Sequence, residues 1–515
     1  MIGLLSAVTT ITTPSIDWFA IAPEIALFAA ALVIVLGRSL IRHDPRVHNA
    51  SLLTAIVGVF CAGIFTVVQW AFVQNDGPYQ AMLSHALHPG DQLVGMVAVD
   101  GFAVFAKMVV LIATLLALLL SSNYLKREQL EGPEYFALML CSATGMLLMT
   151  SANDLVTVFL SLETLSIALY VLAAFDRRRV TSQESGLKYF LLGSFSSAVF
   201  LYGVALVYGA TGTTNLTGIS DFLASTTLLH DGVLVLGIAF LIVGLGFKVA
   251  AAPFHMWTPD VYQGAPTPVT AFMAAATKAA AFAAVLRVFV GSFAIYSVDW
   301  RPIIWVLAAL SLLVGSIAAV VQTDVKRMLA YSSITHAGFV LIAVQAATAK
   351  GTSAALFYVL TYAVMTIGAF AVVGVLATKS DDDHALSDYR GLAARQPVLA
   401  GLLTLFLLAQ AGVPLTGGFV AKLSVFSAAI NVGQYPLALI GMLASVIAAF
   451  VYLRIVLAMY APSEDEALPD PASRAFIDLG TRTALALSAA GVLFLGILPW
   501  GMLDFAKHAT QLLGH

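Results

Sequence analysis

Long apolar stretches alternate with short polar connections over almost the whole chain, from Trp18 towards the C-terminus. Most stretches are near 20 residues long, enough for one α-helix to cross a hydrocarbon layer about 30 Å thick. The pattern predicts an all-α integral membrane protein of about fourteen helices, because no polar connection is long enough to form a domain. The expected spans, to within about 2–4 residues, are 18–40, 49–73, 97–121, 134–150, 153–175, 184–209, 232–252, 267–291, 301–321, 327–347, 352–377, 397–430, 434–460 and 482–506.

The basic residues test this number of helices, because lysine and arginine are enriched in cytoplasmic connections. With the N-terminus outside, the cytoplasmic connections hold 15 of the 25 lysines and arginines, and the opposite side holds three. An odd error in the number of helices would destroy this bias, so both termini are expected on the outer side. The other seven basic residues fall within expected spans: Lys107, Lys188, Lys248, Lys278, Arg287, Lys422 and Arg454.

Composition narrows the function further. Hydrophobic residues make up 60% of the chain and charged residues 10%, against about 25% charged in soluble domains. A net charge of −3 gives no basic face for nucleic acid. Cys61 and Cys141 are too few for an iron–sulfur ligand set or a disulfide framework. Only His255 and His336 lie near spans, which disfavours a haem between helices. The first 16 residues lack lysine and arginine, so no cleavable signal peptide is expected.

Charges inside the spans are the candidates for function, because a charge at the bilayer centre costs about 2.5–3.5 kcal/mol. Glu163, in SLETLSIALY, is the only acid expected deep in a span. Burial alone would protonate it, whereas a lysine partner would keep both groups charged. Separating such a pair would favour release of the lysine's proton. A static ion pair that fixes helix packing is the alternative.

Two lysines lie beside expected breaks in a helix. Lys248 precedes Pro253 in GLGFKVAAAPFHMW, and Lys422 follows Pro414 in GVPLTGGFVAKLSVF, where Gly417 and Gly418 add flexibility. An unbroken helix over 397–430 would be about 51 Å long, which exceeds the membrane. Irregular backbone is tolerated at membrane depth only where it is buried in protein or lines a wet cavity. Paired broken helices therefore indicate a transport site, with ordinary proline kinks as the alternative.

The spacing of these breaks suggests an internal repeat. Pro253 and Pro414 are 161 residues apart, which corresponds to five helices. An odd number of helices per unit inverts the second unit relative to the first. We therefore expect two inverted five-helix repeats, each with a broken helix. The predicted units are residues 1–133 with three helices, 134–291 with the first repeat, 301–460 with the second, and 461–515 with the last helix.

The remaining charged groups have open interpretations. Lys278 lies mid-span among alanines, which leave room for close helices or water. Lys188 lies one turn into its span and is either functional or extended to the interface. His336 follows Ser332 and Ser333 and is either a relay or a packing residue. Arg287 and Arg454 lie near span ends and are expected to reach the interface, and Lys107 is left undecided.

Three motifs carry a resemblance to a known family. GLGFKVAAAPFHMWTPDVYQGAPTPVTAF, KRMLAYSSITHAGF and GVPLTGGFVAKL resemble the antiporter-like membrane subunits of bacterial NADH-quinone oxidoreductase, respiratory complex I. The form WTPDVYQGAP is closer to subunit N than to subunits L and M. A lysine at Lys422, and one more helix at the end of the chain without a long lateral extension, agree with subunit N. The resemblance covers roughly residues 18–506. It implies fourteen helices, inverted repeats and outside termini, in a bacterial plasma membrane.

The resemblance also implies roles for individual residues. Glu163 and Lys248 match the charge-switch pair of the fifth and seventh helices. Lys278 matches the central lysine, and Lys422 the terminal lysine that faces the exit side. Lys188 and His336 match positions that help to connect water chains. Lys107 and Arg287 receive no settled role.

The resemblance implies a non-redox subunit of a proton-pumping translocase. NADH, FMN, iron–sulfur clusters and quinone are expected in other subunits of the complex, and no cofactor or metal in this chain. Its partners would be other membrane subunits, including antiporter-like paralogues, together with lipid, protons and internal water. Moving one proton outward against a membrane potential of 100 mV would require about 2.3 kcal/mol. A subunit of a multi-subunit cation/proton antiporter and a structural spacer of the membrane arm are the alternatives.

Overall fold

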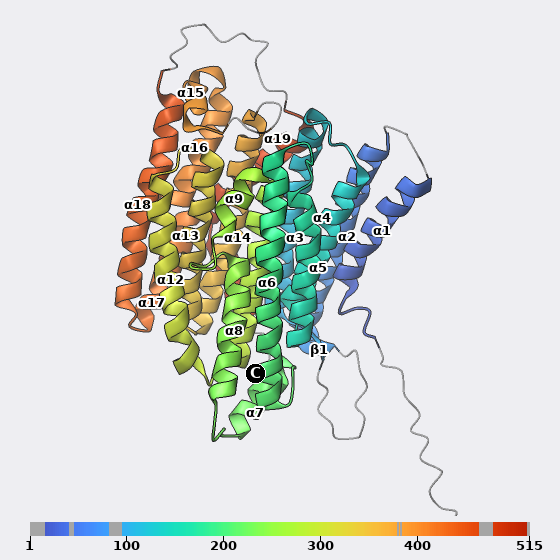
Figure 1. The fold of residues 1–515 in the computed structure, drawn as a ribbon, viewed down its shortest axis with the longest axis vertical. Helices are drawn as coiled ribbons and strands as arrows, with labels where there is room; N and C mark the ends of the chain where they lie inside the picture. Colours follow the sequence, from blue (N-terminus) through green and yellow to red (C-terminus); the bar gives the residue numbers. More distant parts are fainter. Residues whose placement is uncertain are drawn as a thin grey trace, which may run out of the picture.

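The computed structural model describes residues 16–40, 46–81, 95–377, 381, 384–462 and 477–511, and shows a bundle of long helices that run between its two ends (Figure 1). In this part of the chain, 13 helices are long and apolar enough to cross a membrane. The broken helix formed by α16 (Pro397–Ala411) and α17 (Gly417–Asn431) adds the fourteenth predicted crossing. The chain is therefore a multi-pass membrane protein, and the predicted all-α class is confirmed.

The uninterrupted crossings start and end within about six residues of the predicted spans, except at the end of the last one. They are α1 (Ala22–Leu40), α2 (Arg46–Asp76), α3 (Gly101–Arg127), α4 (Pro133–Ser151), α5 (Leu155–Ala173), α6 (Val180–Thr211), α12 (Ser297–Val320), α13 (Val325–Gln345), α14 (Ala349–Leu376), α18 (Tyr435–Tyr460) and α19 (Leu479–Ile497). Figure 1 shows that α1 begins at the end of the bundle opposite α15 (Leu392–Arg395). The C-terminus lies at the same end as the start of α1. An even number of crossings produces this arrangement.

Two crossings are broken where the sequence predicted. The helix α8 (Gly232–Val249) is followed by a non-helical segment around Pro253 and then by α9 (Trp257–Gly264). The backbone leaves α8 through Ala250, at φ +60°. The second break separates α16 from α17, begins at Gly412 with φ +91°, and includes Pro414. A left-handed residue directly after a helix commonly ends it, and glycine adopts that conformation without steric cost.

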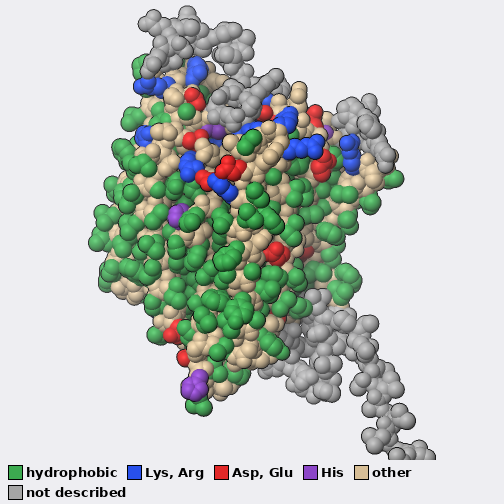
Figure 2. Space-filling model, viewed as in Figure 1, with side chains coloured by type: hydrophobic (Ala, Val, Ile, Leu, Met, Phe, Trp, Pro, Cys, Tyr) green, Lys and Arg blue, Asp and Glu red, His purple; other side chains and the backbone are tan. Residues whose placement is uncertain are grey.

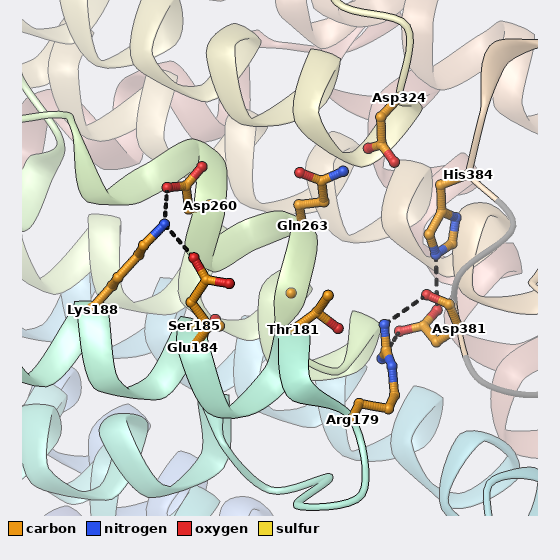
Figure 3. A pocket seen from close by; sticks show the side chains of 11 residues that line it. Arg179, Thr181, Glu184, Ser185, Lys188, Asp260, Gln263, Asp324, Asp381 and His384 are labelled. Carbon is orange, nitrogen blue, oxygen red and sulfur yellow. Dashed lines mark hydrogen bonds and ion pairs between the residues drawn. The ribbon is translucent and has the colours of Figure 1, made fainter.

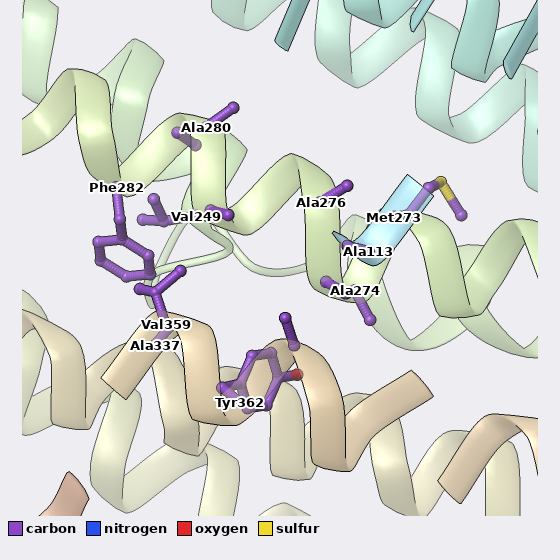
Figure 4. Packing of buried hydrophobic residues seen from close by; sticks show 14 of the residues in the cluster. Ala113, Val249, Met273, Ala274, Ala276, Ala280, Phe282, Ala337, Val359 and Tyr362 are labelled. Atoms are coloured by element: carbon purple, nitrogen blue, oxygen red, sulfur yellow. The ribbon is translucent and has the colours of Figure 1, made fainter. Parts of the chain in front are cut away.

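The central crossing, residues 267–292, is not one regular α-helix. It consists of α10 (Thr267–Phe272), the π-helix η1 (Met273–Thr277), α11 (Lys278–Val285) and the π-helix η2 (Leu286–Ser292). Insertions of π-helix occur frequently at functional sites. Small side chains such as Ala274, Ala276 and Ala280 line this crossing, and α14 approaches it with Val359 and Tyr362 (Figure 4).

The structure corrects three details of the prediction. The last crossing ends at Ile497 rather than near 506, because Pro499 cannot continue the helix, and a separate helix α20 (Trp500–Gln511) follows. The predicted loop near 210–231 contains the helix α7 (Leu216–Ser225). Two short strands lie in and directly after the predicted loop near 74–96: β1 (Tyr79–Ala81) pairs antiparallel with β2 (Val97–Val99). A 3₁₀ turn η3 (Leu386–Tyr389) precedes α15.

The surface separates by side-chain type. Lysine and arginine side chains gather near one end of the visible face, and hydrophobic side chains cover the band below them (Figure 2). The central crossing, α13 and α14 are buried almost completely, whereas α2 and α18 expose many apolar side chains. The core therefore lies along the central crossing, where the buried lysines are. The inverted relation between the two predicted five-helix units stays a prediction.

Candidate functional site

Lys248 lies in the last turn of α8, at the first helix break, and its side chain is buried. The ammonium donates a 3.4 Å hydrogen bond to the hydroxyl of Tyr189. It also lies 5.0 Å from the ring centre of Tyr189 and 5.6 Å from that of Tyr170. Aromatic faces stabilise a cation that has lost its water. The C-terminal end of α8 adds negative potential at the same place.

Glu163 and Lys248 do not form an ion pair in the described structure. Glu163 lies on α5, seven residues before Tyr170 on the same helix, and is only partly buried. Its Oε1 atom is buried without a hydrogen bond to any other described residue. The tyrosine rings, not the carboxylate, contact the ammonium. The predicted switch therefore has its two members near one another in the bundle without direct contact.

Lys278 occupies the junction between η1 and α11 and is buried. Its ammonium donates hydrogen bonds to the backbone carbonyl and the hydroxyl of Ser333 on α13. Tyr362 of α14 donates a 2.7 Å hydrogen bond to the same hydroxyl. Three helices thus meet at one serine, and in the described residues no carboxylate pairs with this lysine.

A run of polar groups continues from the neighbouring serine, Ser332. Its hydroxyl contacts the hydroxyl of Tyr452 and donates a 3.3 Å hydrogen bond to Oε1 of Gln410, at the end of α16. His336 lies between two tyrosines, with Nε2 3.2 Å from the Tyr452 hydroxyl and Nδ1 2.7 Å from that of Tyr358. The expected polar surroundings of His336 are therefore present, and they are mostly tyrosines.

Lys422 lies in the second turn of α17, and its side chain reaches back across the second break. Its ammonium donates a 2.8 Å hydrogen bond to the carbonyl of Ala411, the last residue of α16, and lies 4.8 Å from the ring centre of Phe339. The last carbonyls of a helix lack partners within it and carry negative potential. Each break therefore places a lysine at the carbonyl end of its first half-helix. This explains why Lys248 precedes its proline and Lys422 follows its own.

Gly418→Ala is expected to disrupt the second break. A Cβ atom at Gly418 would lie 1.8 Å from the carbonyl oxygen of Ala409, a backbone atom that cannot rotate away. Overpacking of this kind costs about 1–3 kcal/mol or more. Gly401→Ala, on α16, is the control, because a Cβ atom there meets nothing within 4 Å. The thermal stability of the protein should fall for the first variant only, and equal stability for both would contradict the close contact.

Lys188 lies outside this buried chain, at a cavity of about 210 Å³ beneath the basic end of the molecule (Figure 3). Its ammonium is 2.6 Å from Glu184 and 2.6 Å from Asp260, and Arg327 lies 2.6 Å from the second oxygen of Asp260. Partial burial raises the pKa of Asp260, but the hydrogen bonds from Lys188 and Arg327 outweigh it and leave that pKa below its ordinary value. The structure therefore places Lys188 at a half-exposed ionic network.

Asp381, which the sequence assigned to a loop, is a buried carboxylate at the same cavity. Lys326 approaches it at 3.3 Å, Arg179 at 3.5 Å and His384 at 3.0 Å (Figure 3). Thr267, the first residue of α10, also donates to it. Burial raises the pKa of Asp381, but Lys326, His384 and Arg179 together hold it well below the ordinary value. The cluster joins the connection after α14 to the start of the central crossing.

Two further buried ion pairs account for charges that had no assigned role. Lys107 lies 2.8 Å from Glu24, an acid on α1 that sequence reasoning missed. Arg287 forms two hydrogen bonds, of 2.8 and 3.0 Å, with Asp100, the residue that precedes α3. The first pair joins α1 to α3, and the second joins the start of α3 to the central crossing. The expectation that Arg287 reaches the interface was wrong, because its side chain is 7% exposed.

Comparison with known proteins shows which family has this architecture. A family model described as NADH:quinone oxidoreductase/Mrp antiporter, TM, matches residues 152–448. NADH-quinone oxidoreductase subunit N of Trichlorobacter lovleyi is 41% identical over 496 residues, covering 96% of this chain and 97% of that protein. Subunit N of Mycobacterium tuberculosis is 40% identical over 543 residues, covering 97% and 99%. The chain belongs to the NADH-quinone oxidoreductase subunit N family.

Solved structures agree with membership of the subunit N family. A chain of respiratory complex I from Thermus thermophilus is 33% identical, with a TM-score of 0.75 over 94% of this chain and 98% of that one. A chain of the Mrp complex from Dietzia shares the fold, with a TM-score of 0.81 at 22% identity and 96% coverage of both chains. The resemblance inferred from the three motifs is confirmed.

For this member of the subunit N family, sequence reasoning found the lysines but missed most of their partners. Tyr170, Tyr189, Tyr362 and Tyr452 all lie within apolar spans, where a tyrosine is ordinarily a core residue. Gln410 gave one usable signal, because a polar amide two residues before the break at Gly412 is unusual in an otherwise apolar span. Among the described residues, no group of three or more His, Cys, Asp or Glu side chains could hold a metal ion.

Proposed function

We propose that this chain is a proton-translocating membrane subunit of NADH-quinone oxidoreductase. The observation that carries the proposal is the polar chain within the apolar bundle: Lys278 bonded to Ser333, and Ser332 bonded through Gln410 towards the break that Lys422 closes. Buried charges without a carboxylate partner are costly in a membrane and usually belong to a transport route. Lys278 is bonded to a hydroxyl, a group that can both accept and donate a proton.

Unpaired polar atoms along the same axis support a hydrated route. Side-chain atoms of Tyr170, Tyr262, Thr277 and Gln410, and Oε1 of Glu163, are buried without a hydrogen bond to another described residue. Buried polar groups of this kind ordinarily bind ordered water. Water between the lysines would connect the breaks in the chain of side chains. A packed structural spacer would instead leave these atoms uncompensated.

The distribution of basic residues predicts which end of the molecule faces which side of the membrane. The basic end of the molecule would face the cytoplasm, and both termini would lie on the outer side of a bacterial plasma membrane. The cavity beside Lys188 and Asp260 opens at the basic end and would take up protons. Lys422, on the half-helix that leads away from that end, would release them outside.

The coupling step is assigned to Glu163 and Lys248. Moving the Glu163 carboxylate towards Lys248 would favour its ammonium form, and moving it away would favour proton release to Lys278. Lys278 would then pass the proton on to Lys422. The force that moves these groups would come from redox chemistry in partner subunits, which would carry NADH, FMN, iron–sulfur clusters and quinone. This chain would contribute translocation and no redox step.

The antiporter alternative is less well supported by the chemistry of the axis. The buried ammonium groups of the axis repel Na⁺, whereas Na⁺ sites in proteins are built from oxygen ligands around the ion. Purification of the chain with its neighbours separates the two cases. NADH dehydrogenase subunits are expected, and small antiporter subunits in their place would support the alternative.

Glu163→Gln and Lys248→Met are expected to reduce proton pumping by the assembled complex about tenfold or more, since each removes one member of the charge switch. The measurement is NADH-driven proton uptake into membrane vesicles, normalised to the amount of assembled complex. Glu134→Gln is the control, because this exposed glutamate begins α4 away from the axis. Wild-type pumping in both switch variants would refute the assignment and favour a structural spacer.

A further inference from the structure

Tyr262 is a buried residue of α9 that the proposed lysine route does not use. Its side chain is 0% exposed. Its hydroxyl makes no hydrogen bond to another residue of the described chain. The ring packs against Trp257 and Phe370, at centroid distances of 6.1 and 6.2 Å. A buried tyrosine hydroxyl ordinarily has a partner, so this one requires an explanation.

One side of Tyr262 faces the Lys248 group. Trp257 stacks on Tyr189 at 4.6 Å with an interplanar angle of 14°, and Tyr189 accepts the hydrogen bond from Lys248. The indole N–H of Trp257 can only donate, and it is already bonded to the carbonyl of Phe247 at 3.1 Å. The tryptophan therefore positions the two tyrosines but cannot relay a proton between them.

The other side of Tyr262 faces the Lys278 group. The helix that carries Tyr262, α9, packs against α13, which carries Ser333. The Tyr262 ring also contacts Phe370 of α14, the helix that carries Tyr362. The Tyr262 hydroxyl itself makes no hydrogen bond with a described residue. The Ser333 oxygen already accepts hydrogen bonds from Lys278 and Tyr362. A hydroxyl has two acceptor lone pairs and one donor. Ser333 can therefore only donate further, and the oxygen of Tyr262 is an acceptor without a partner.

We propose that the Tyr262 hydroxyl is the proton relay between the Lys248 and Lys278 groups, an inference that rests on the proposed function. When Lys248 is protonated, the chain of donors runs from Lys248 through Tyr189 and one bridging water to Tyr262, then through Ser333 to the neutral amine of Lys278. A shift of one proton along each bond leaves Lys248 neutral and Lys278 charged. Each hydroxyl gains one proton and loses one, and all bonds then point the opposite way.

Tyr262→Phe tests the relay, because it keeps the ring against Trp257 and Phe370 and removes only the hydroxyl. NADH-driven proton uptake by the assembled complex should fall on the order of tenfold, since a positioned proton-transfer group contributes about 10²–10⁴-fold to the step it serves. The solvent deuterium isotope effect on coupled turnover should also rise, because proton transfer becomes limiting. Tyr389→Phe is the matched control, since it removes a buried hydroxyl that also lacks a partner, outside the lysine axis.

Normal pumping with an unchanged isotope effect in Tyr262→Phe would overturn the relay. If Lys278→Met abolishes pumping in the same assay, that result overturns the relay alone and leaves the proposed function standing. If Lys278→Met also pumps normally, the proposed function fails as well. Should Tyr262→Phe assemble poorly, Ser333→Ala interrupts the same link from its other end, and normal pumping in that variant contradicts the relay equally.

Discussion

Lys278→Met is expected to reduce proton translocation through this subunit by on the order of 10²-fold. Methionine fills a similar volume, but it cannot hold a charge at the middle of the bundle, where a charge costs about 2.5–3.5 kcal/mol. Without the ammonium and its bonds to Ser333, that energy is added to the barrier for proton transfer. At about 1.36 kcal/mol for each factor of ten in rate, the loss corresponds to about two orders of magnitude.

The measurement for Lys278→Met is the number of protons moved per NADH oxidised in proteoliposomes that contain the assembled complex. Lys507→Met is the control, because that lysine is 62% exposed on α20, where it pairs with Asp504. We expect an unchanged ratio for the control and a lowered ratio for Lys278→Met. An unchanged ratio in both variants would show that the central lysine carries no protons.

The prediction from sequence was strongest where one physical rule dominates. Apolar length decided the crossings, and the left-handed residues at Ala250 and Gly412 lie at the predicted breaks. The buried lysines were found because an ammonium in an apolar span has few structural explanations. The last crossing was misjudged because apolar residues continue past Pro499, and hydrophobicity alone does not show that a second helix, α20, begins there.

The sequence could not predict which groups would meet across the bundle. A Glu163–Lys248 contact was expected because opposite charges are costly to bury separately. The structure places Lys248 among aromatic rings instead, which also stabilise a cation and look like ordinary core residues in sequence. Lys326 lies in a predicted cytoplasmic connection, between the spans 301–321 and 327–347, yet its side chain is completely buried. Such pairings depend on helix rotation, which a one-dimensional pattern does not fix.

The Asp381 cluster leads to the second large expected effect, in stability rather than transport. Asp381→Asn removes the carboxylate that compensates Lys326, whose side chain is as deeply buried as that of Asp381. Removing one partner of a buried ion pair typically costs about 3–5 kcal/mol, because the remaining charge loses its counterion. We expect less assembled complex in the membrane and a lower unfolding temperature.

The acid dependence of the same cluster provides an independent check. Because the folded pKa of Asp381 lies below its ordinary value, its contribution to stability is present above an unfolded pKa of about 3.9 and is lost as the pH falls towards the folded value. The wild type should therefore lose its advantage over Asp381→Asn only below about pH 4. Asp221→Asn, at an exposed position on α7, is the control and should match the wild type throughout. Equal stability of Asp381→Asn and Asp221→Asn near pH 7 would mean that Lys326 is compensated elsewhere, and that the cluster does not hold the start of the central crossing in place.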